Sequence, residues 1–390
     1  MKVTQIYEIM NTVTKEILGK SDIVLEDLSN IVDVGKAILD ASAVDNYVKV
    51  LVDQVGKLVF VDRVYRGSAP SVLMDAWEYG SIVEKIQMDM PEATENESWD
   101  LVDKQTYNQD MFYKPSVSVK FFNNKTTFEI PCSFTELQVK ESFQNATQLN
   151  SFTSMIYNAI DKSMTVKTDA LIMRTINNFT AATISTDYGE EALNSKSGKR
   201  AINLLYLYNQ ENGGALRPEE AVKDPEFLRY ATATINLTAE RMKRISTNFN
   251  MGGKERFTPE DMMHIVMLAD FQRYAEVYLY SGVGQFNDKN LRLPEAETVP
   301  YWQGQGVSYQ FGSTSKINVK AAMENGQTKE VEATGILAVI FDRDALGVTN
   351  FNRRVTSHYN AKAEFYNNWY KMDAGYFNDF NENFVVFFVA

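Results

Sequence analysis

Apolar residues recur every three or four positions in two stretches of residues 1–45, which is the period of an amphipathic helix. The first stripe consists of Ile6, Met10, Val13 and Ile17, and the second of Ile31, Val34, Ala37 and Ile38. We therefore expect two short helices. The periodicity leaves two arrangements open: an N-terminal arm, or two helices packed on the protein's own core.

From Lys57 the pattern changes to that of β-strands. The segment LVFVDRVY is β-branched and aromatic, and Ile86, Met88 and Met90 alternate with polar residues. Strand character returns at PSVSVKFF, followed by a turn at NNKT. The next strand carries Phe128, Ile130, Cys132 and Phe134 on one face. Pro131 within it indicates an edge strand, because proline donates no hydrogen bond to a neighbour.

An acidic stretch without periodicity, MPEATENESWDLVDKQTYNQD, separates these strands. We expect roughly 50 residues, from Ser81 to Phe134, to form long strands around a polar tip. Such an isolated ribbon is marginal in water, so it either folds back on its own domain or is covered by a neighbouring subunit. The length of the tip and its acids favour projection toward a neighbour. These acids are Asp89, Glu92, Glu95, Glu97, Asp100 and Asp103.

Helical signals follow the last of these strands. Ser133 and Glu136 have the spacing of a capping box, which marks a helix start. The longest apolar stripe with helical period runs from Asn150 to Asn178 and predicts a rod of roughly 40 Å. Further helices are expected at Ala201–Tyr208, from Pro225 onward and around Arg241.

The C-terminal part is strand-rich. Residues 262–280 mix strand and helix signals, and the apolar, β-branched segment from Gly335 to Phe341 predicts a buried strand. The chain closes with NFVVFFVA. Such an apolar end would aggregate if exposed, so this strand must be paired and covered.

Composition narrows the function. With 390 residues, 44% of them hydrophobic, the chain can bury a sizeable core in more than one domain. The net charge of −12 argues against a sequence-specific duplex-binding protein, but not against one that encloses DNA. A single cysteine, Cys132, fits a reducing cytosol. We find no signal-peptide core and no apolar run of membrane-spanning length, so we expect no membrane association.

No catalytic, cofactor or metal site is expected. His264 lies in an apolar stretch and His358 beside polar residues, and neither has a second ligand at zinc spacing. Cys132 shares a face with apolar residues, which favours a buried thiol over a nucleophile. Asp342 and Asp344 flank an arginine at a strand end, where an ion pair or turn cap is favoured over acid–base chemistry.

Basic residues gather after the middle of the chain. They are Arg241, Lys243, Arg244, Lys254 and Arg256. Two interpretations remain open: a solvated helix face, or a docking ridge for the acidic tip of a neighbouring subunit.

Two stretches resemble major capsid proteins of tailed phages with the Hong Kong 97-type fold, particularly those of phages of Gram-positive hosts. The first, residues 111–178, begins with MFYKPSVSVKFF and is similar to the returning strand of that family's extended loop and the spine helix after it. The second joins GILAVIFDRDALGV to the segment HYNAKAEFYNNWYKMDAGYFNDFNENFVVFFV. It is similar to the closing segment of the axial domain and the strands that return to the periphery.

The resemblance implies an α+β fold of four parts. These are an N-terminal arm (1–56), an extended β-hairpin loop or E-loop (57–133), a peripheral domain (134–225) with its spine helix at 150–178, and an axial domain (226–390). Closing strands of the axial domain return to the peripheral domain.

The function implied is that of a major capsid protein. Hexamers and pentamers of the chain would form an icosahedral shell around double-stranded DNA, after synthesis in the host cytoplasm. The implied partners are the chain itself, a scaffolding protein, a portal protein, a decoration protein and non-specifically enclosed DNA. Some members carry a long helical pro-segment for which this chain has no room, so the scaffolding protein is expected to be separate.

Contacts between subunits are expected at the acidic tip and the basic cluster. The candidate residues are Glu92, Glu95, Glu97, Asp100, Asp103, Phe112, Lys114, Arg241, Lys243 and Arg244. Reversing Glu95 and Glu97 to lysine should then impair assembly and leave the subunit folded.

Two alternatives stand beside this interpretation. An encapsulin-like compartment has the same fold and differs in its contents, a cargo enzyme instead of a genome. A glycan hydrolase using Asp342 and Asp344 belongs to a different class, and a monomeric protein that cleaves a polysaccharide would favour it.

Overall fold

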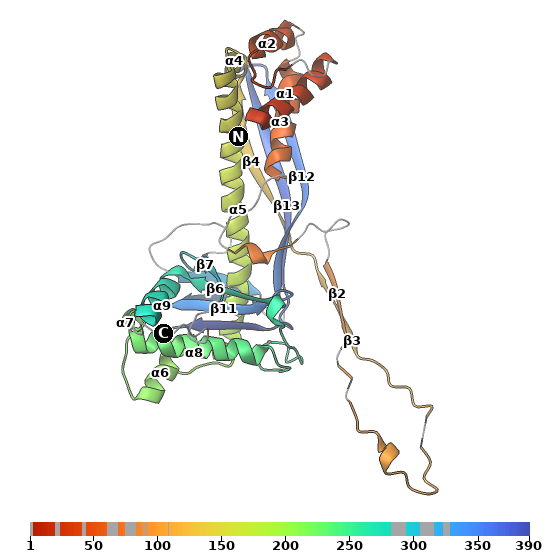
Figure 1. The fold of residues 1–390 in the computed structure, drawn as a ribbon, viewed down its shortest axis with the longest axis vertical. Helices are drawn as coiled ribbons and strands as arrows, with labels where there is room; N and C mark the ends of the chain where they lie inside the picture. The colour runs from red at the N-terminus through yellow and green to blue at the C-terminus, as the bar shows by residue number, and fades with distance from the viewer. Residues whose placement is uncertain are drawn as a thin grey trace.

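The computed structural model describes residues 3–19, 24–40, 44–60, 69–74, 83–88, 90–91, 93–107, 109–281, 294–304, 316–322 and 328–390. One long helix runs through the body, a compact lobe surrounds its C-terminal half, and a two-stranded ribbon leaves the body sideways (Figure 1). Among the described helices, none combines the length and apolarity needed to cross a bilayer.

The long helix α5 (Ala146–Tyr188) begins at the side chain of Asn145, which accepts a hydrogen bond from the Gln148 amide, and ends before Gly189 at φ 61°. Its 43 residues contain neither glycine nor proline and span about 65 Å. The expected end at Asn178 was wrong. The residues beyond it include threonines that are buried beside Phe179 and Ile184, and the Thr183 hydroxyl donates to the Phe179 carbonyl one turn earlier, which satisfies it inside the core.

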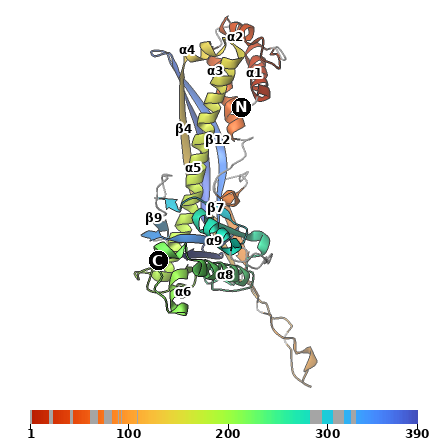
Figure 2. The same cartoon turned by 60° about the vertical axis from the view of Figure 1, so that its left-hand side comes forward.

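The upper part of the body packs around the N-terminal half of α5. A four-stranded sheet in the order β1-β12-β13-β4 lies along the helix (Figure 2). The N-terminal helices and α4 close this core, which includes Ile6, Val13, Val48 and Phe134. The elements are α1 Val3–Leu18, α2 Ile31–Asp40, α3 Val44–Phe60, α4 Glu136–Ser142, β1 Leu73–Met74, β4 Lys125–Thr135, β12 Leu346–Asn360 and β13 Phe365–Asn378. A 3-10 turn at Pro70–Val72 precedes β1.

This packing decides between the two arrangements left open for the N-terminus. The helices α1, α2 and α3 lie on the protein's own core: α3 packs against α5 and β12, α1 packs against α3 and α5, and α2 packs against α1 and α3. The strand expected from Lys57 is wrong at its start, since Lys57–Phe60 ends α3, and residues 61–68 lie outside the described part.

The lower lobe is built on a five-stranded sheet in the order β5-β14-β11-β6-β7. Helices α6, α8 and α9 and the C-terminal half of α5 contribute to its core. The elements are β5 Ala201–Asn203, α6 Leu204–Asn212, α7 Pro218–Ala221, α8 Pro225–Met242, β6 Met263–Leu268, α9 Ala269–Ser281, β7 Glu297–Val299, β11 Ile336–Asp342 and β14 Phe384–Phe388. A 3-10 turn at Glu260–Met262 precedes β6. A smaller sheet, β10-β9-β8, contains β8 Gln303–Gly304, β9 Lys316–Ala322 and β10 Thr328–Thr334.

The predictions for the last strands are confirmed. β14 pairs with β11 on one side and β5 on the other, and every residue of β14 is buried. Phe384 stacks on Phe179 of α5 at 4.1 Å between ring centroids. The start of α8 at Pro225 is also confirmed, whereas the helix expected from Ala201 begins only at Leu204, after the short strand β5.

The projecting ribbon is shorter than expected. It consists of β2 (Val83–Met88) and β3 (Val117–Phe122). The strand after the NNKT turn, β4, instead pairs with β13 over its whole length and belongs to the body. Pro131 does lie in an edge strand, as predicted, because β4 is the last strand of its sheet. The helix after it is capped by Thr135 with Gln138, two residues later than expected.

Candidate functional site

The ribbon β2–β3 has two faces of opposite character. Val83 pairs with Phe122 at its base and Met88 with Val117 at its outer end. Alternate residues therefore point to opposite sides. One side carries Lys85, Gln87 and Lys120, which contact the body, and the other carries Ile86 and Val119, which face away from it.

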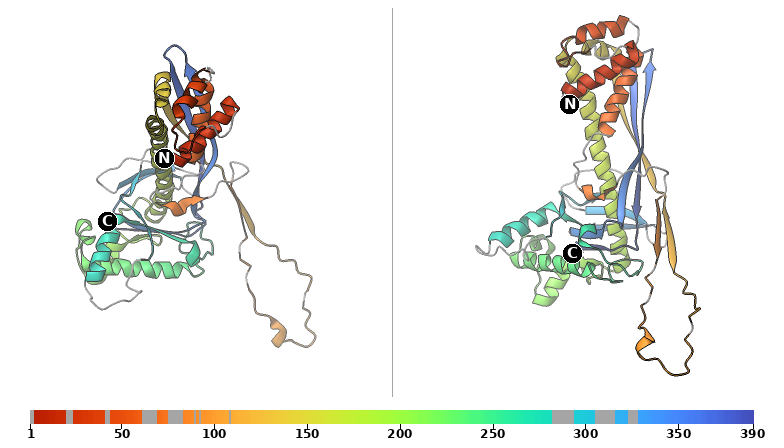
Figure 3. Two further views of the ribbon diagram at one scale, coloured as in Figure 1. Left: turned by 45° about the horizontal axis from the view of Figure 1, so that its top comes forward. Right: turned by 45° about the vertical axis from the view of Figure 1, so that its right-hand side comes forward.

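The apolar face is thus the exposed one. Its members are Ile86, Met88, Val117, Val119 and Phe121, of which Ile86 is 64% and Phe121 65% exposed. In a soluble antiparallel ribbon the apolar face normally packs on the core and the polar face meets water. Here the arrangement is inverted: the polar face of the two strands lies against the body, and the loop beyond them extends away from the body in each view of Figure 3.

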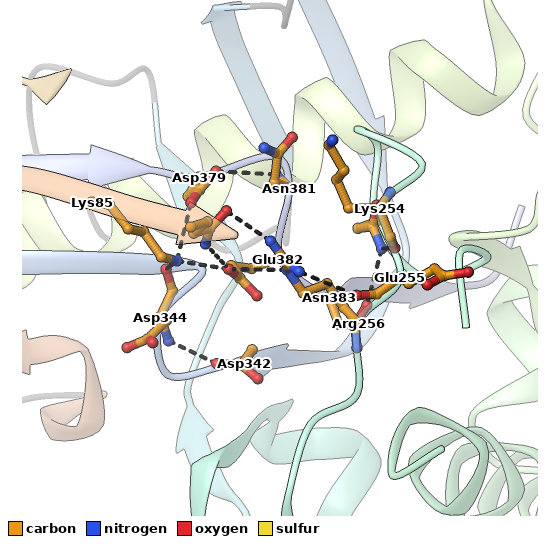
Figure 4. Close-up of polar contacts among 12 residues, drawn as sticks. Lys85, Lys254, Glu255, Arg256, Asp342, Asp344, Asp379, Asn381, Glu382 and Asn383 are labelled. Atoms are coloured by element: carbon orange, nitrogen blue, oxygen red, sulfur yellow. Dashed lines mark hydrogen bonds and ion pairs between the residues drawn. The ribbon is translucent and has the colours of Figure 1, made fainter. Parts of the chain in front are cut away.

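Two lysines of the ribbon bind buried acids of the body. Lys85 Nζ lies 3.0 Å from Asp379 Oδ2 and 2.7 Å from Glu382 Oε1, and Lys120 Nζ lies 3.0 Å from Asp379 Oδ1 (Figure 4). Asp379 is fully buried, in the turn between β13 and β14. We call Lys85, Lys120, Asp379, Glu382 and Arg256 the ribbon anchor.

Arg256 completes the anchor from the lower lobe. Its guanidinium donates to Gln87 Oε1 at 2.8 Å and lies 3.5 Å from Glu382 Oε1. Glu382 also accepts a hydrogen bond from Gln87 Nε2 at 2.6 Å. Three cations therefore surround two carboxylates, and each carboxylate is held by both the ribbon and the body.

The charges of the anchor stabilise one another. Burial by itself raises the pKa of Asp379, but Lys85 and Lys120 outweigh it and hold that pKa below its ordinary value. Burial by itself lowers the pKa of Lys85, whereas Asp379 and Glu382 raise it above the usual range. Both groups are therefore charged at neutral pH, and neither is available as an acid or base.

An aromatic contact supports the base of the ribbon. The rings of Phe122 and Phe377 lie 5.2 Å apart, so the last residue of β3 packs on β13. The ribbon is thus held at its base by ring packing and along its inner face by charge.

The tip beyond Met88 and Val117 is exposed. A single 3-10 turn, Glu97–Trp99, lies within it. Trp99 is 97% and Phe112 83% exposed, and Tyr113, Leu101 and Val102 are exposed beside them. Of the predicted acids, Glu95, Asp100 and Asp103 are exposed, as is Lys114. Asp89 and Glu92 lie outside the described residues, and the structure does not describe the side chain of Glu97.

The structure gives the residues of the basic cluster, for which a solvated helix face and a docking ridge were both left open, different surroundings. Lys243 binds Glu240 at 2.9 Å and Glu260 at 3.3 Å, and Arg256 belongs to the ribbon anchor. Arg241 and Arg244 are exposed, and within the described part of the chain they form no ion pair.

The remaining candidates have structural roles. Asp342 caps a turn by accepting from the Asp344 amide at 2.9 Å, as predicted, and burial raises its pKa. His264 is half-buried beside Phe341, and His358 is exposed. Burial raises the pKa of the Cys132 thiol, which keeps it protonated. Among the described residues, no group of His, Cys, Asp and Glu could hold a metal ion.

Sequence reasoning missed the anchor. Lys85 and Gln87 alternate with apolar residues, and that pattern predicted a strand without indicating any partner for its polar face. A signal was present in the repetition of the pattern on β3, where Ser118 and Lys120 alternate with valine and phenylalanine. Their partners Asp379 and Glu382 follow more than 250 residues later, so no local pattern links them.

Comparison with known proteins identifies a matching protein family and solved structures with a similar fold. The model of the family described as Phi29-like phage major capsid protein matches residues 10–388. A chain of the capsid structure of Staphylococcus phage Andhra is similar with a TM-score of 0.50 and 10% identity, covering 84% of this chain and 86% of that one. A chain from the structure of the head fiber and inner core protein gp22 of native bacteriophage P68 has the same TM-score and identity, with 85% and 86% covered. No curated protein matches.

Proposed function

The chain belongs to the Phi29-like phage major capsid proteins, and from that membership we propose that the ribbon is the element by which one subunit holds the next. As a member of this family it is a structural protein, not an enzyme. It assembles with copies of itself into the capsid shell of the virion and has the Hong Kong 97-type α+β fold. Neither the encapsulin-like compartment nor the glycan hydrolase receives support.

The inverted ribbon carries the proposal. Its polar face is clamped to its own subunit by Lys85 and Lys120, so rotation that would hide the apolar face against the body would break four ion pairs and hydrogen bonds to Asp379 and Glu382. The apolar face, with Ile86, Val119 and Phe121, remains open to solvent. Covering it is favourable by roughly 25 cal/mol per Å² of apolar area, and the surface of an adjoining subunit can supply that cover.

The four-part division of the family fits this arrangement once its boundaries are revised. We assign the E-loop to the ribbon and its tip, Val83–Phe122, and the peripheral domain to α5 with the four-stranded sheet. The axial domain then corresponds to the lower lobe. Residues 1–56 keep the position of the N-terminal arm, although their described helices pack on the body.

Further partners follow from the same role. Hexamers and pentamers are the closed rings that build such a shell, and a head-to-tail contact between identical subunits forms a ring wherever its rotation closes. We propose a separate scaffolding protein, a portal protein at one vertex and a decoration protein on the outer surface, with assembly in the host cytoplasm. The net charge of −12 is compatible with a shell that encloses DNA, because an acidic protein does not bind the phosphate backbone tightly.

Shortening the ribbon tests the proposal. Met88 and Val117 face each other across the two strands, so an Asn-Gly turn can replace residues 89–116 and close the hairpin. The wild-type chain and the shortened chain are each produced with the phage's head-assembly proteins and inspected by sedimentation and electron microscopy. We expect shells from the wild type and folded, unassembled subunits from the shortened chain. Normal shells from the shortened chain would contradict the proposal.

A further inference from the structure

Resting on this proposed role of the ribbon, we infer that its tip docks on one defined surface of the adjoining subunit, at the C-terminal end of α8. We call this surface the α8 patch. It consists of Leu237, Arg241, Arg244, Ile245 and Phe257, all of them exposed.

The backbone brings these residues together. After α8 ends at Met242, Ser246 forms an antiparallel bridge with Arg256 through two backbone hydrogen bonds of 2.9 and 3.1 Å. This register places Ile245 opposite Phe257. The Thr258 amide donates to the Met242 carbonyl at 2.8 Å and fastens the returning segment to the helix end. Leu237 and Arg241 lie one turn apart on the same face of α8, and Ile245 follows in the turn after the helix.

The α8 patch is apolar at its centre. Leu237, Ile245 and Phe257 are 50%, 57% and 51% exposed. Single exposed apolar residues are common, but three that converge on a rigid helix end form a patch that another protein surface can cover.

The α8 patch carries positive charge from Arg241 and Arg244. Lys243, in the same turn, is neutralised by Glu240 and Glu260. Arg241 and Arg244 have no ion pair in the part of the chain that the structure describes, although the protein has a net charge of −12. The apolar centre is therefore bordered by two free guanidinium groups.

The ribbon tip has the complementary composition. Residues 95–114 contain five acids and two lysines, a net charge of −3. Among them Trp99, Leu101 and Phe112 are more exposed than most apolar side chains of the protein. An acidic, aromatic tip and a basic, apolar patch can bury their apolar atoms while carboxylates meet guanidinium groups at the rim.

The occupant is a second copy of this chain, not the tip of the same chain. Arg256, next to Phe257, contacts Gln87 in the subunit's own ribbon. Beyond Gln87 the ribbon continues away from the body, so its own tip lies far from the α8 patch (Figure 1). A tip of one subunit on the patch of the next is a head-to-tail contact, the type that closes rings of identical subunits.

Cross-linking tests the contact directly. Cys132 is replaced by alanine, and Trp99→Cys is combined with Ile245→Cys. Assembled particles are treated with a short bismaleimide and analysed on a denaturing gel. We expect a ladder of covalent multimers from this pair and monomers from each single-cysteine variant. The matched control combines Trp99→Cys with Met155→Cys, which is 51% exposed on α5, and should yield monomers. Monomers from the Trp99/Ile245 pair, or a ladder from the control pair, would overturn the inference.

A charge exchange tests the electrostatic part and does not depend on the cysteines. Glu95→Lys with Asp100→Lys should reduce the yield of particles at least tenfold. Adding Arg241→Glu and Arg244→Glu should restore at least half of the wild-type yield, because the opposite charges face each other again. Adding Lys162→Glu and Lys167→Glu, on the exposed side of α5, should restore nothing.

The outcomes separate this inference from the proposed function. A tip reversal without effect, or one that the arginine reversal fails to rescue, would overturn docking on the α8 patch. The role of the ribbon in assembly would then still stand on the failure of the shortened chain to form shells. Normal shells from the shortened chain would remove both.

Discussion

Lys85 of the ribbon places its Nζ 3.0 Å from Oδ2 of Asp379, a carboxylate that has no exposed surface. An isolated buried carboxylate is strongly destabilising, so the lower lobe depends on a cation that the ribbon brings to it. The reverse also holds, since Asp379 binds Lys120 as well and so fixes the inner face of both ribbon strands. The position of the assembly element and the stability of the lobe are thereby coupled.

Removal of Lys85 tests this coupling. Lys85→Met leaves Asp379 and Glu382 with Lys120 and Arg256 alone, and should lower the free energy of unfolding by about 2–4 kcal/mol, somewhat less than the loss of a fully buried ion pair. Urea unfolding of the unassembled subunit measures it, and limited proteolysis should cut the ribbon faster. Lys104→Met, in the exposed tip, is the control and should change neither quantity. Equal stability of both variants would argue against the anchor.

The anchor should weaken in acid. The folded-state pKa of Asp379 lies below its ordinary value of 3.8, because Lys85 and Lys120 outweigh the effect of burial. Ionised Asp379 therefore contributes stability at pH above 3.8, and this contribution is lost as the pH falls through the folded-state pKa. Between pH 7 and pH 3 the wild type should lose more unfolding free energy than Asp379→Asn. Equal losses would show that Asp379 does not contribute in this way.

The exposed face of the ribbon should matter for assembly and not for folding. Ile86→Asp with Val119→Asp places two charges where a neighbour is expected to cover apolar side chains, each worth roughly 1.5–3 kcal/mol when buried. We expect unchanged circular dichroism and unfolding, but no shells by electron microscopy. Glu84→Gln, on the same face of β2, is the control and should assemble normally. Shells from the double variant would mean that this face stays in water.

Gly335 should not tolerate a side chain. Its φ is 73°, and an added Cβ would collide with the carbonyl oxygen of Val389, whose own amide donates to the Gly335 carbonyl at 2.9 Å. Gly335→Ala should cost about 2–4 kcal/mol in unfolding free energy, from backbone strain together with the collision. Gly213→Ala has a similar φ of 59° but open space around it, so it isolates the strain and should cost less. Similar losses in both variants would show that the collision is relieved.

Several features followed from sequence alone. The buried strands β11 and β14, the start of α8 at Pro225 and the edge position of Pro131 are confirmed, and a ribbon with an acidic tip projects as predicted, although it ends at Phe122 and not at Phe134. Each rests on a local signal: a short apolar run, a proline, or an apolar face with no partner within reach along the chain. The resemblance of residues 111–178, 335–348 and 358–389 to tailed-phage capsid proteins agrees with the family that matches the chain.

Tertiary structure decided the rest. Whether β4 pairs with β3 or with β13 depends on residues 365–375. The polar face of the ribbon lies against the body because Asp379 and Glu382 bind Lys85 there. The extension of α5 past Asn178 likewise requires the lobe that buries its threonines. Local patterns report how a segment alternates between polar and apolar. They do not report which of its two faces is exposed to water, because contacts with residues distant in the chain determine which face is buried.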